Sequence, residues 1–260
     1  MKIVLGHPKL FNKKLCNNIE HFKNLDLIIG KIKEELIKLN VEVIQPRNNK
    51  RKDISNALWF RDNFINVDNK LYLLNKTTSK ERKPVEELST INISGTKVDN
   101  YFIDGGDVIQ HNDLIFVGLS DRTEKKSIDW FKKELKKKEI VKIKHHALHL
   151  DCCFCVLPNN IIIYSKKYIK SFPSFLRDKY KVHCIEEFMK EGEETNLGTN
   201  ILIIGKNIIA IDRKKFYKFY NFLQSMDFNL ILIPFFNLWK DGGGIRCLTQ
   251  WIDKGVLSVV

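Results

Sequence analysis

The sequence predicts an α/β fold made of five similar units that close around a common axis. Two observations carry this prediction. Strand–turn–strand patterns recur about 45 residues apart along the chain, and amphipathic helical patterns lie between them. A unit of this size cannot bury its apolar face alone, so neighbouring units are expected to pack together and close. With 260 residues and an ordinary hydrophobic fraction of 43%, the chain is long enough to form a single catalytic domain over 1–260.

The first predicted elements are a strand at the N-terminus and a helix within 19–39. The opening residues, MKIVLGHPKLFNKK, contain a short apolar stretch that is typical of a buried strand. This stretch lacks the apolar segment of roughly 7–15 residues found in signal peptides, so we do not expect a secreted protein. The helix has one apolar stripe at helical spacing. The stripe is formed by Leu25, Ile28, Ile32, Leu36 and Leu39.

Five hairpins are predicted after this helix. Their turns contain Asn, Asp, Gly or Pro, the residues that tight strand connections use. The segments are RDNFINVDNKLYLL, GDVIQHNDLIFVGL, LDCCFCVLPNNIIIYS, TNILIIGKNIIAID and RCLTQWIDKGVLSVV. Their alignment places five polar positions in register, and closure of the units would gather these positions near the axis. The register positions are Asp62, Asp107, Asp151, Asn200 and Cys247.

Helices and further strands fill the intervals between the hairpins. Helical patterns cover 124–138 and 213–226, and apolar strands are expected at 139–144 and 230–235. The repeated unit therefore combines a helix, a strand and a hairpin.

The charge of the chain is strongly positive but evenly spread. The formal net charge is +13, from 44 Lys and Arg against 31 Asp and Glu. The densest lysine run, 124–139, is a helix with one apolar stripe and a solvated lysine face. No basic patch with interleaved aromatic residues is found, so nucleic acid is not expected as the main partner. No apolar run approaches the roughly 18–20 residues that span a bilayer, which predicts a soluble, cytoplasmic protein without a membrane partner.

The six cysteines are better explained as thiols than as a disulfide framework, because the chain is long and carries no secretion signal. The DCCFC segment lies just after His145, His146 and His149, which suggests a zinc site as an alternative. However, the adjacent Cys152 and Cys153 would point to opposite faces of a strand, and no second half-site accompanies them. We therefore expect buried thiols here, with no metal and no cofactor.

The register positions combine three carboxylates, an amide and a thiol. An ordinary packed core avoids such groups because the burial of charge is costly, so their recurrence indicates a functional site. Carboxylates beside a thiol raise its pKa, unless the substrate is itself a cation. A guanidinium is planar, positive and rich in hydrogen-bond donors that match carboxylates. Asp62 and Asp151 can hold such a group.

A substrate of this kind suggests a reaction. The substrate's charge would help Cys247 to ionise, and the thiolate would attack the central guanidinium carbon. His149 would protonate the departing amine and later activate water. Either Asp104 or Asp107 of the DGGD segment would orient His149. The glycines of DGGGIRCLTQW, 241–251, would let the backbone pass close to a flat substrate.

Three segments resemble a known family: FIDGGDVIQHNDLIFVGLSDRT, LHLDCCFCVL and GGGIRCLTQ. They are similar to the guanidino-group-modifying enzymes of the pentein, or amidinotransferase, superfamily, and above all to dimethylarginine dimethylaminohydrolase. The resemblance runs from about Met1 to the C-terminus. It implies a five-bladed, pseudo-symmetric α/β propeller with a central active site, built from repeated ββαβ-type units.

The resemblance also implies roles for individual residues. Cys247 matches the nucleophile, His149 the general acid/base, and Asp104 the carboxylate that pairs with this histidine. Asp62 matches the aspartate that binds the guanidinium, and Arg122 matches an arginine that holds the substrate α-carboxylate.

Five residues bear further on the identity of the substrate. Arg82 lies near the position of a second carboxylate-binding arginine, and Asp151 and Asp107 complete the expected substrate-binding set. Arg61 stands where dimethylargininases usually have an acid, and Asn56 where some have an aspartate. The Arg-Asp and His-x-Asp patterns are closer to arginine deiminases and amidinotransferases. Their second acid also holds the guanidinium, although those enzymes are typically longer.

The prediction is a hydrolase that cleaves a C–N bond of a guanidino compound, either methylated arginine or arginine. The product would be a ureido compound such as citrulline. An amidinotransferase or an arginine or agmatine deiminase on the same fold is the first alternative, and a binding protein without catalysis is the second. The expected partner is a small guanidino substrate, and a homodimer is left open.

Overall fold

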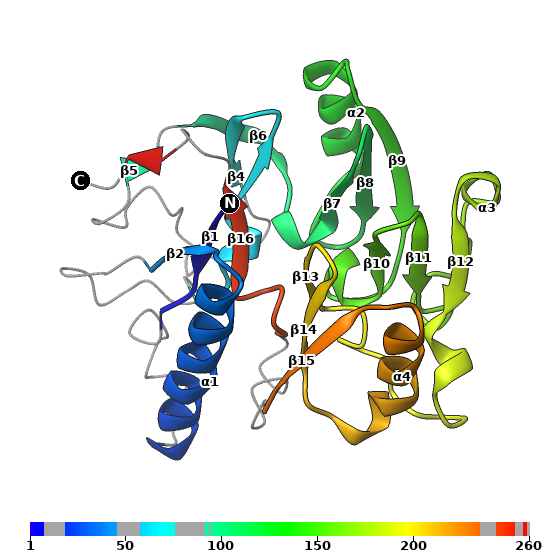
Figure 1. The fold of residues 1–260 in the computed structure, drawn as a ribbon. Helices are drawn as coiled ribbons and strands as arrows, with labels where there is room; N and C mark the ends of the chain where they lie inside the picture. The colour runs from blue at the N-terminus through cyan, green and yellow to red at the C-terminus, as the bar shows by residue number, and fades with distance from the viewer. Residues whose placement is uncertain are drawn as a thin grey trace. The chain divides into compact units, whose positions relative to one another are not determined.

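The computed structural model describes residues 1–7, 19–45, 58–75, 92–93, 95–234, 243–252 and 257–258. The chain divides into two compact units (Figure 1). Unit 1 comprises 1–105 and 235–260, and unit 2 comprises 106–234. The single domain over 1–260 stays a prediction.

Among the described residues, the strands form five three-stranded sheets of one topology and one additional two-stranded pair. In each three-stranded sheet the central strand pairs antiparallel with one neighbour and parallel with the other. Unit 1 holds the sheets β16–β1–β2 and β3–β4–β6, and unit 2 holds β7–β8–β9, β10–β11–β12 and β13–β14–β15. The predicted repeat is therefore present in the pairing of the strands.

The strands of unit 1 are β1 (Lys2–Leu5), β2 (Glu42–Ile44), β3 (Phe64–Val67), β4 (Lys70–Asn75), β5 (Asn92–Ile93), β6 (Thr96–Phe102), β16 (Thr249–Ile252) and β17 (Leu257–Ser258). Those of unit 2 are β7 (Val108–His111), β8 (Leu114–Leu119), β9 (Glu139–Lys144), β10 (Phe154–Leu157), β11 (Ile161–Tyr164), β12 (Lys181–Cys184), β13 (Leu202–Ile204), β14 (Asn207–Ile211) and β15 (Asn229–Ile233).

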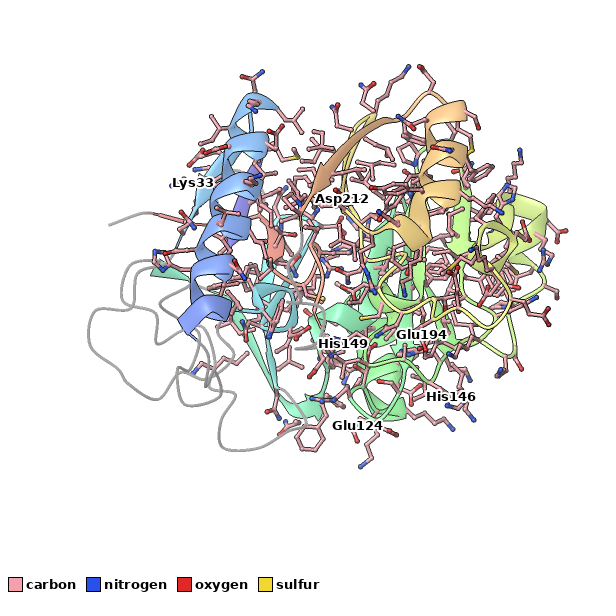
Figure 2. The ribbon with its side chains drawn as sticks, turned by 90° about the horizontal axis from the view of Figure 1, so that it is seen from below. Lys33, Glu124, His146, His149, Glu194 and Asp212 are labelled. Atoms are coloured by element: carbon pink, nitrogen blue, oxygen red, sulfur yellow. The ribbon has the colours of Figure 1, made fainter. Side chains whose placement is uncertain are left out.

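The first predicted helix is α1 (Ile19–Lys38), which connects β1 to the parallel strand β2. Its predicted stripe is buried from Leu25 to Leu36, as the helical period requires. Charged residues, among them Lys33, lie on the rest of the helix (Figure 2). Asn40 ends the helix in the left-handed region at φ 56°.

Four of the five predicted hairpins form between the expected strands: β3–β4, β7–β8, β10–β11 and β13–β14. Their turns use residues that accept a positive φ. Gly205 has φ 59°, and the other turn residues with positive φ are Asp68, Asn69, Asn112, Asn159 and Asn160. The local turn chemistry was therefore sufficient to locate these hairpins.

The fifth hairpin, within 246–260, was predicted wrongly. Its first strand, β16, pairs antiparallel with β1 from the other end of the chain, with Leu5 opposite Thr249 and Lys2 opposite Ile252. The last strand, β17, pairs with β5 instead. The core of β1, from Ile3 to Leu5, is fully buried, so the N-terminal strand takes the place that a local hairpin would have filled.

The predicted helices of unit 2 are confirmed. They are α2 (Lys125–Glu134), which leads into β9, and α4 (Tyr217–Ser225), which follows the short helix η8 (Lys214–Phe216) and leads into β15. Ile128 and Phe131 face inward from α2, and Phe219 and Leu223 face inward from α4. The link between β11 and β12 contains only the short helix α3 (Leu176–Lys179).

No helix among the described residues is long and apolar enough to cross a membrane.

Candidate active site

Each of the five register positions lies shortly before the edge strand that pairs antiparallel with the central strand of a three-stranded sheet. Asp62 ends the short helix η3 (Phe60–Asp62), Asp107 ends η5 (Gly105–Asp107), and Asp151 lies within η6 (Leu150–Cys152). Asn200 precedes β13 and Cys247 precedes β16. All five are at most 4% exposed, so the repeat buries one polar group at the same place in every sheet.

In unit 1, the backbone of Arg61 joins the segments that carry three predicted site residues. Its N–H donates to the carbonyl oxygen of Cys247 at 3.2 Å. A Cβ atom at Gly105, the residue after Asp104, would lie 2.0 Å from the Arg61 carbonyl oxygen. Asp62 is the next residue along the chain. The folded unit therefore brings the Asp62, Asp104 and Cys247 segments together around one peptide.

The Arg61 side chain turns to Gln250 of β16. Its Nη1 donates to Gln250 Oε1 at 2.6 Å, and Gln250 Nε2 donates to the carbonyl oxygens of Arg61 and Phe64. The backbone N–H of Trp251 also donates to Gln250 Oε1, at 3.1 Å. Sequence reasoning noted Arg61 only as a departure from dimethylargininases and missed Gln250, whose sole signal was a polar residue in an apolar strand.

One of the three glycines before Cys247 has a clear packing reason. A Cβ atom at Gly243 would lie 2.2 Å from two carbons of the Trp59 indole. Trp59 is largely buried and directly precedes η3. The segment leading to the cysteine therefore passes against the segment leading to Asp62, and only glycine leaves enough room.

In unit 2, the predicted acid/base His149 lies in extended backbone directly before η6. It is 2% exposed, and its ring packs on the backbone of Gly106. A Cβ atom at Gly106 would lie 2.7 Å from Cγ and 2.8 Å from Nδ1 of His149. The second glycine of the DGGD segment is therefore required for the imidazole to occupy this place.

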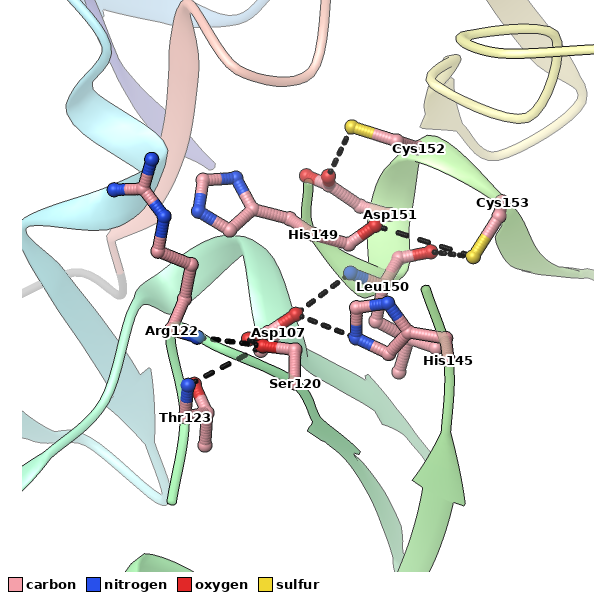
Figure 3. A network of polar contacts seen from close by, with 10 residues as sticks. All are labelled: Asp107, Ser120, Arg122, Thr123, His145, His149, Leu150, Asp151, Cys152 and Cys153. Carbon is pink, nitrogen blue, oxygen red and sulfur yellow. Dashed lines mark hydrogen bonds and ion pairs between the residues drawn. The ribbon is translucent and has the colours of Figure 1, made fainter. Parts of the chain in front are cut away.

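The Asp107 carboxylate accepts hydrogen bonds on both oxygens (Figure 3). Oδ1 accepts from Nε2 of His145 at 2.9 Å and from the backbone N–H of Leu150 at 2.7 Å. Oδ2 accepts from the Ser120 hydroxyl at 2.7 Å. Sequence reasoning proposed Asp107 for substrate binding or for orienting His149, and it missed Ser120 and the role of His145.

Asp107 is fully buried and charged. Burial raises the pKa of Asp107, but the hydrogen bond from His145, the nearby charge of His149 and the hydroxyl of Ser120 outweigh this effect. The pKa of the carboxyl therefore lies below its ordinary value.

The loop that follows β8 carries Arg122. Its backbone N–H donates to the Ser120 hydroxyl oxygen at 3.0 Å, and that of Thr123 donates to the same oxygen at 3.2 Å. In Figure 3 the Arg122 guanidinium, the His149 ring and the Asp151 carboxylate extend to one side of the network, away from His145. Three of the predicted site residues in unit 2 therefore lie on the same side of this network in that view.

Asp151 is fully buried. Its Oδ1 accepts from the Cys152 thiol at 3.6 Å, and its backbone oxygen accepts from the Thr199 hydroxyl at 3.3 Å. The N–H of Leu197 donates to the Cys152 carbonyl oxygen at 3.1 Å. The 197–199 segment therefore holds the backbone of η6 in place.

The cysteines of the DCCFC segment are buried thiols. The Cys153 thiol donates to the Leu150 carbonyl oxygen at 3.5 Å. Burial, together with the carboxylates of Asp107 and Asp151, raises the pKa of Cys153 well above its ordinary value. Metal ions bind the thiolate form, so this environment makes Cys153 itself a poor metal ligand.

Three other residues were named from the sequence. Asp104 is fully buried between β6 and η5. Arg82 and Asn56 lie outside the described residues.

Two sequence comparisons gave matches, one to a family and one to a single protein. The sequence pattern of the arginine deiminase family matches residues 25–184. The uncharacterized protein YkgA of Bacillus subtilis (strain 168) is 34% identical over 167 residues. This match covers 63% of the present chain and 56% of YkgA, so the chain spans little more than half the length of this relative.

Solved structures of similar fold were also found. The N-terminal domain of ArgZ, a cyanobacterial arginine dihydrolase, has a TM-score of 0.79 at 17% identity, with 99% of each chain covered. The dimethylarginine dimethylaminohydrolase of Pseudomonas aeruginosa has a TM-score of 0.73 at 12% identity, with 96% of the present chain and 98% of the other covered. This similarity confirms the predicted fold class, the α/β propeller of the penteins.

Proposed function

The chain belongs to the arginine deiminase family, and on that premise we propose that it hydrolyses a C–N bond of a guanidino compound. The observation that carries the proposal is the arrangement in unit 1, where the Arg61 peptide joins the Cys247 segment to those of Asp62 and Asp104. This arrangement of a thiol and two buried carboxylates on adjoining segments is poorly suited to a neutral or anionic substrate. It suits a cation, which offsets the carboxylates and favours the thiolate.

The proposed reaction has two stages. Asp62 and Asp151 hold the guanidinium, and the Cys247 thiolate bonds to its central carbon. The carbon–nitrogen bond to the leaving amine then breaks, and His149 supplies the proton that this amine takes away. In the second stage His149 takes a proton from water, which attacks the same carbon. The carbon–sulfur bond breaks, a ureido product leaves and the thiolate is restored.

Other residues orient these groups. Asp104 pairs with His149, and Arg122 binds the carboxylate of an amino-acid substrate. Arg82 is proposed as a second group for this carboxylate.

Among guanidino compounds, arginine fits this set better than dimethylarginine. A second acid, Asp151, favours nitrogens that keep their hydrogens over nitrogens that carry methyl groups. Two of the similar structures support a covalent route to such a product. An ArgZ variant was solved covalently bound to a reaction intermediate, and a cysteine-to-serine variant of the Pseudomonas enzyme was solved with citrulline.

A ureido-product colour assay tests the proposal on arginine, monomethylarginine, dimethylarginine and agmatine. We expect turnover by the wild-type protein and none by Cys247→Ser. Cys184→Ser, a change at a half-buried thiol of β12, is the matched control and should retain activity. Product formed at the wild-type rate by Cys247→Ser would rule out the mechanism. A product that forms only with added amine would indicate amidine transfer instead.

A further inference from the structure

His145 is a buried histidine that the proposed reaction does not use. It follows β9 and is 3% exposed. Its Nε2 lies 2.9 Å from Asp107 Oδ1, whereas its Nδ1 has no hydrogen-bond partner among the described residues. A buried polar atom in this state is unfavourable and calls for an explanation.

The other ring nitrogen of His145 connects it, through Asp107, to residues of the proposed active site. Besides His145, the Asp107 carboxylate binds the N–H of Leu150, the residue directly after the proposed acid/base His149. It also binds the Ser120 hydroxyl, which in turn accepts the N–H of Arg122. One carboxylate is therefore connected by short hydrogen bonds to the backbone beside two functional residues.

Close packing leaves this carboxylate little freedom. A Cβ atom at Gly118 would lie 2.6 Å from His145 Nε2 and 2.8 Å from Asp107 Oδ1. On the chain preceding Asp107, Gly106 lies directly against the His149 ring. In such a tightly packed region, a displacement of Asp107 is transmitted to the His145 and His149 rings.

We propose that Asp107, held in place by His145, is a positioning residue that sets the places of both His149 and Arg122 in the active site. The inference rests on the proposed function, because it assigns an effect on turnover to residues that do not touch the substrate. It replaces direct substrate binding as the role of Asp107. The connection through Leu150 governs His149 and hence kcat, whereas the connection through Ser120 governs Arg122 and hence KM.

The two connections can be separated by mutation. Ser120→Ala removes only the hydroxyl between Asp107 and the Arg122 loop, so KM for arginine should rise about tenfold while kcat stays close to wild type. His145→Leu releases Asp107, so kcat should fall by about 10²-fold and KM should rise as well. His145→Gln keeps a donor and should recover part of this loss. Ser225→Ala, on the exposed side of α4, is the control and should change neither constant.

The charge of Asp107 can be tested by the pH dependence of the reaction rate. Asp107→Asn keeps the shape of the side chain but removes a negative charge that interacts with His149. The limb of the pH–rate profile that reports His149 should therefore move to lower pH. A limb that stayed in place would contradict the interaction between the Asp107 carboxylate and His149.

Amide hydrogen exchange tests the network without relying on turnover. In His145→Leu, the amides of Leu150, Arg122 and Thr123 should exchange faster than in wild type, while those of the β13–β14 hairpin remain protected and show that the variant is folded. Unchanged exchange at Leu150 and Arg122 would overturn the proposal, and so would unchanged kcat and KM in the folded variant. If the wild-type protein converts no guanidino compound, the proposed function fails. The exchange measurement would still decide whether the network holds these loops.

Discussion

Arg61 is a buried cation whose side chain bonds Gln250 through Nη1. Its planar guanidinium matches an amide oxygen in a fixed direction, which a lysine ammonium on a flexible stem does not. The Arg61 peptide also contacts the segments of Cys247 and Gly105. A displacement of the Arg61 side chain would therefore shift the backbone that positions the nucleophile. Arg61 is therefore best understood as a residue that builds the site.

Arg61→Lys should consequently reduce activity although it conserves the charge. We expect kcat/KM for arginine to fall by at least about tenfold, because one charge-assisted hydrogen bond is lost or lengthened. The matched control is Arg177→Lys in the short helix α3, where the arginine is exposed. Steady-state kinetics of the two variants make the comparison, and equal activity in both would show that the Arg61–Gln250 pair does not support the site.

The lowered pKa of Asp107 predicts how stability depends on pH. A carboxyl whose pKa is lower in the folded than in the unfolded protein stabilises the fold at pH values above its unfolded pKa, about 3.9. This contribution is lost as the pH falls through the lower, folded value. The difference in Tm between wild type and Asp107→Asn should therefore be larger at neutral pH than near pH 3. Thermal unfolding of both proteins across this pH range is the measurement. A difference in Tm that does not change with pH would contradict the lowered pKa of Asp107 in the folded protein.

At the scale of elements, the sequence was most informative where structure is local. The apolar stripe of α1 and the turn residues of the four hairpins follow from period and turn chemistry, and they were predicted. The pairing of β16 with β1 depends on residues at opposite ends of the chain, and no local pattern specifies it. The same distinction holds in the site. The register positions could be predicted from the repeat, whereas the bonds of Asp107 to His145 and Ser120 depend on how neighbouring strands end.

Two glycines in different elements make a matched test of how the His149 ring packs on Gly106. Gly106→Ala places a methyl group within 2.8 Å of the His149 ring, so kcat should fall by about 10²-fold. Gly30 lies in α1, where a methyl group would meet no described atom within 4 Å beyond its own helix backbone. Gly30→Ala should leave kinetics unchanged and stabilise the protein by about 0.5–1 kcal/mol, the helix preference of alanine. Kinetics and urea unfolding of both variants test the pair, and an active Gly106→Ala protein would contradict the proposed placement of His149.

At the scale of the whole molecule, the same strand arrangement recurs in five sheets, and each sheet is preceded by one buried polar position. The repeat thus supplies one polar side chain per sheet, a thiol at one position and carboxylates or an amide at the others. The strand at the N-terminus, β1, and the strand that follows Cys247, β16, pair in one sheet. The Cys247 segment therefore depends on the N-terminal strand, as well as on its own neighbours in sequence.

The central claim is that Cys247 forms a covalent bond with the carbon of a guanidino substrate. Mass spectrometry of protein quenched during turnover of arginine tests it most directly. We predict an adduct with the mass of arginine less ammonia, located on the peptide that contains Cys247 and absent from Cys247→Ser. Ureido product that forms without any adduct on this peptide, and at an undiminished rate in Cys247→Ser, would contradict the account.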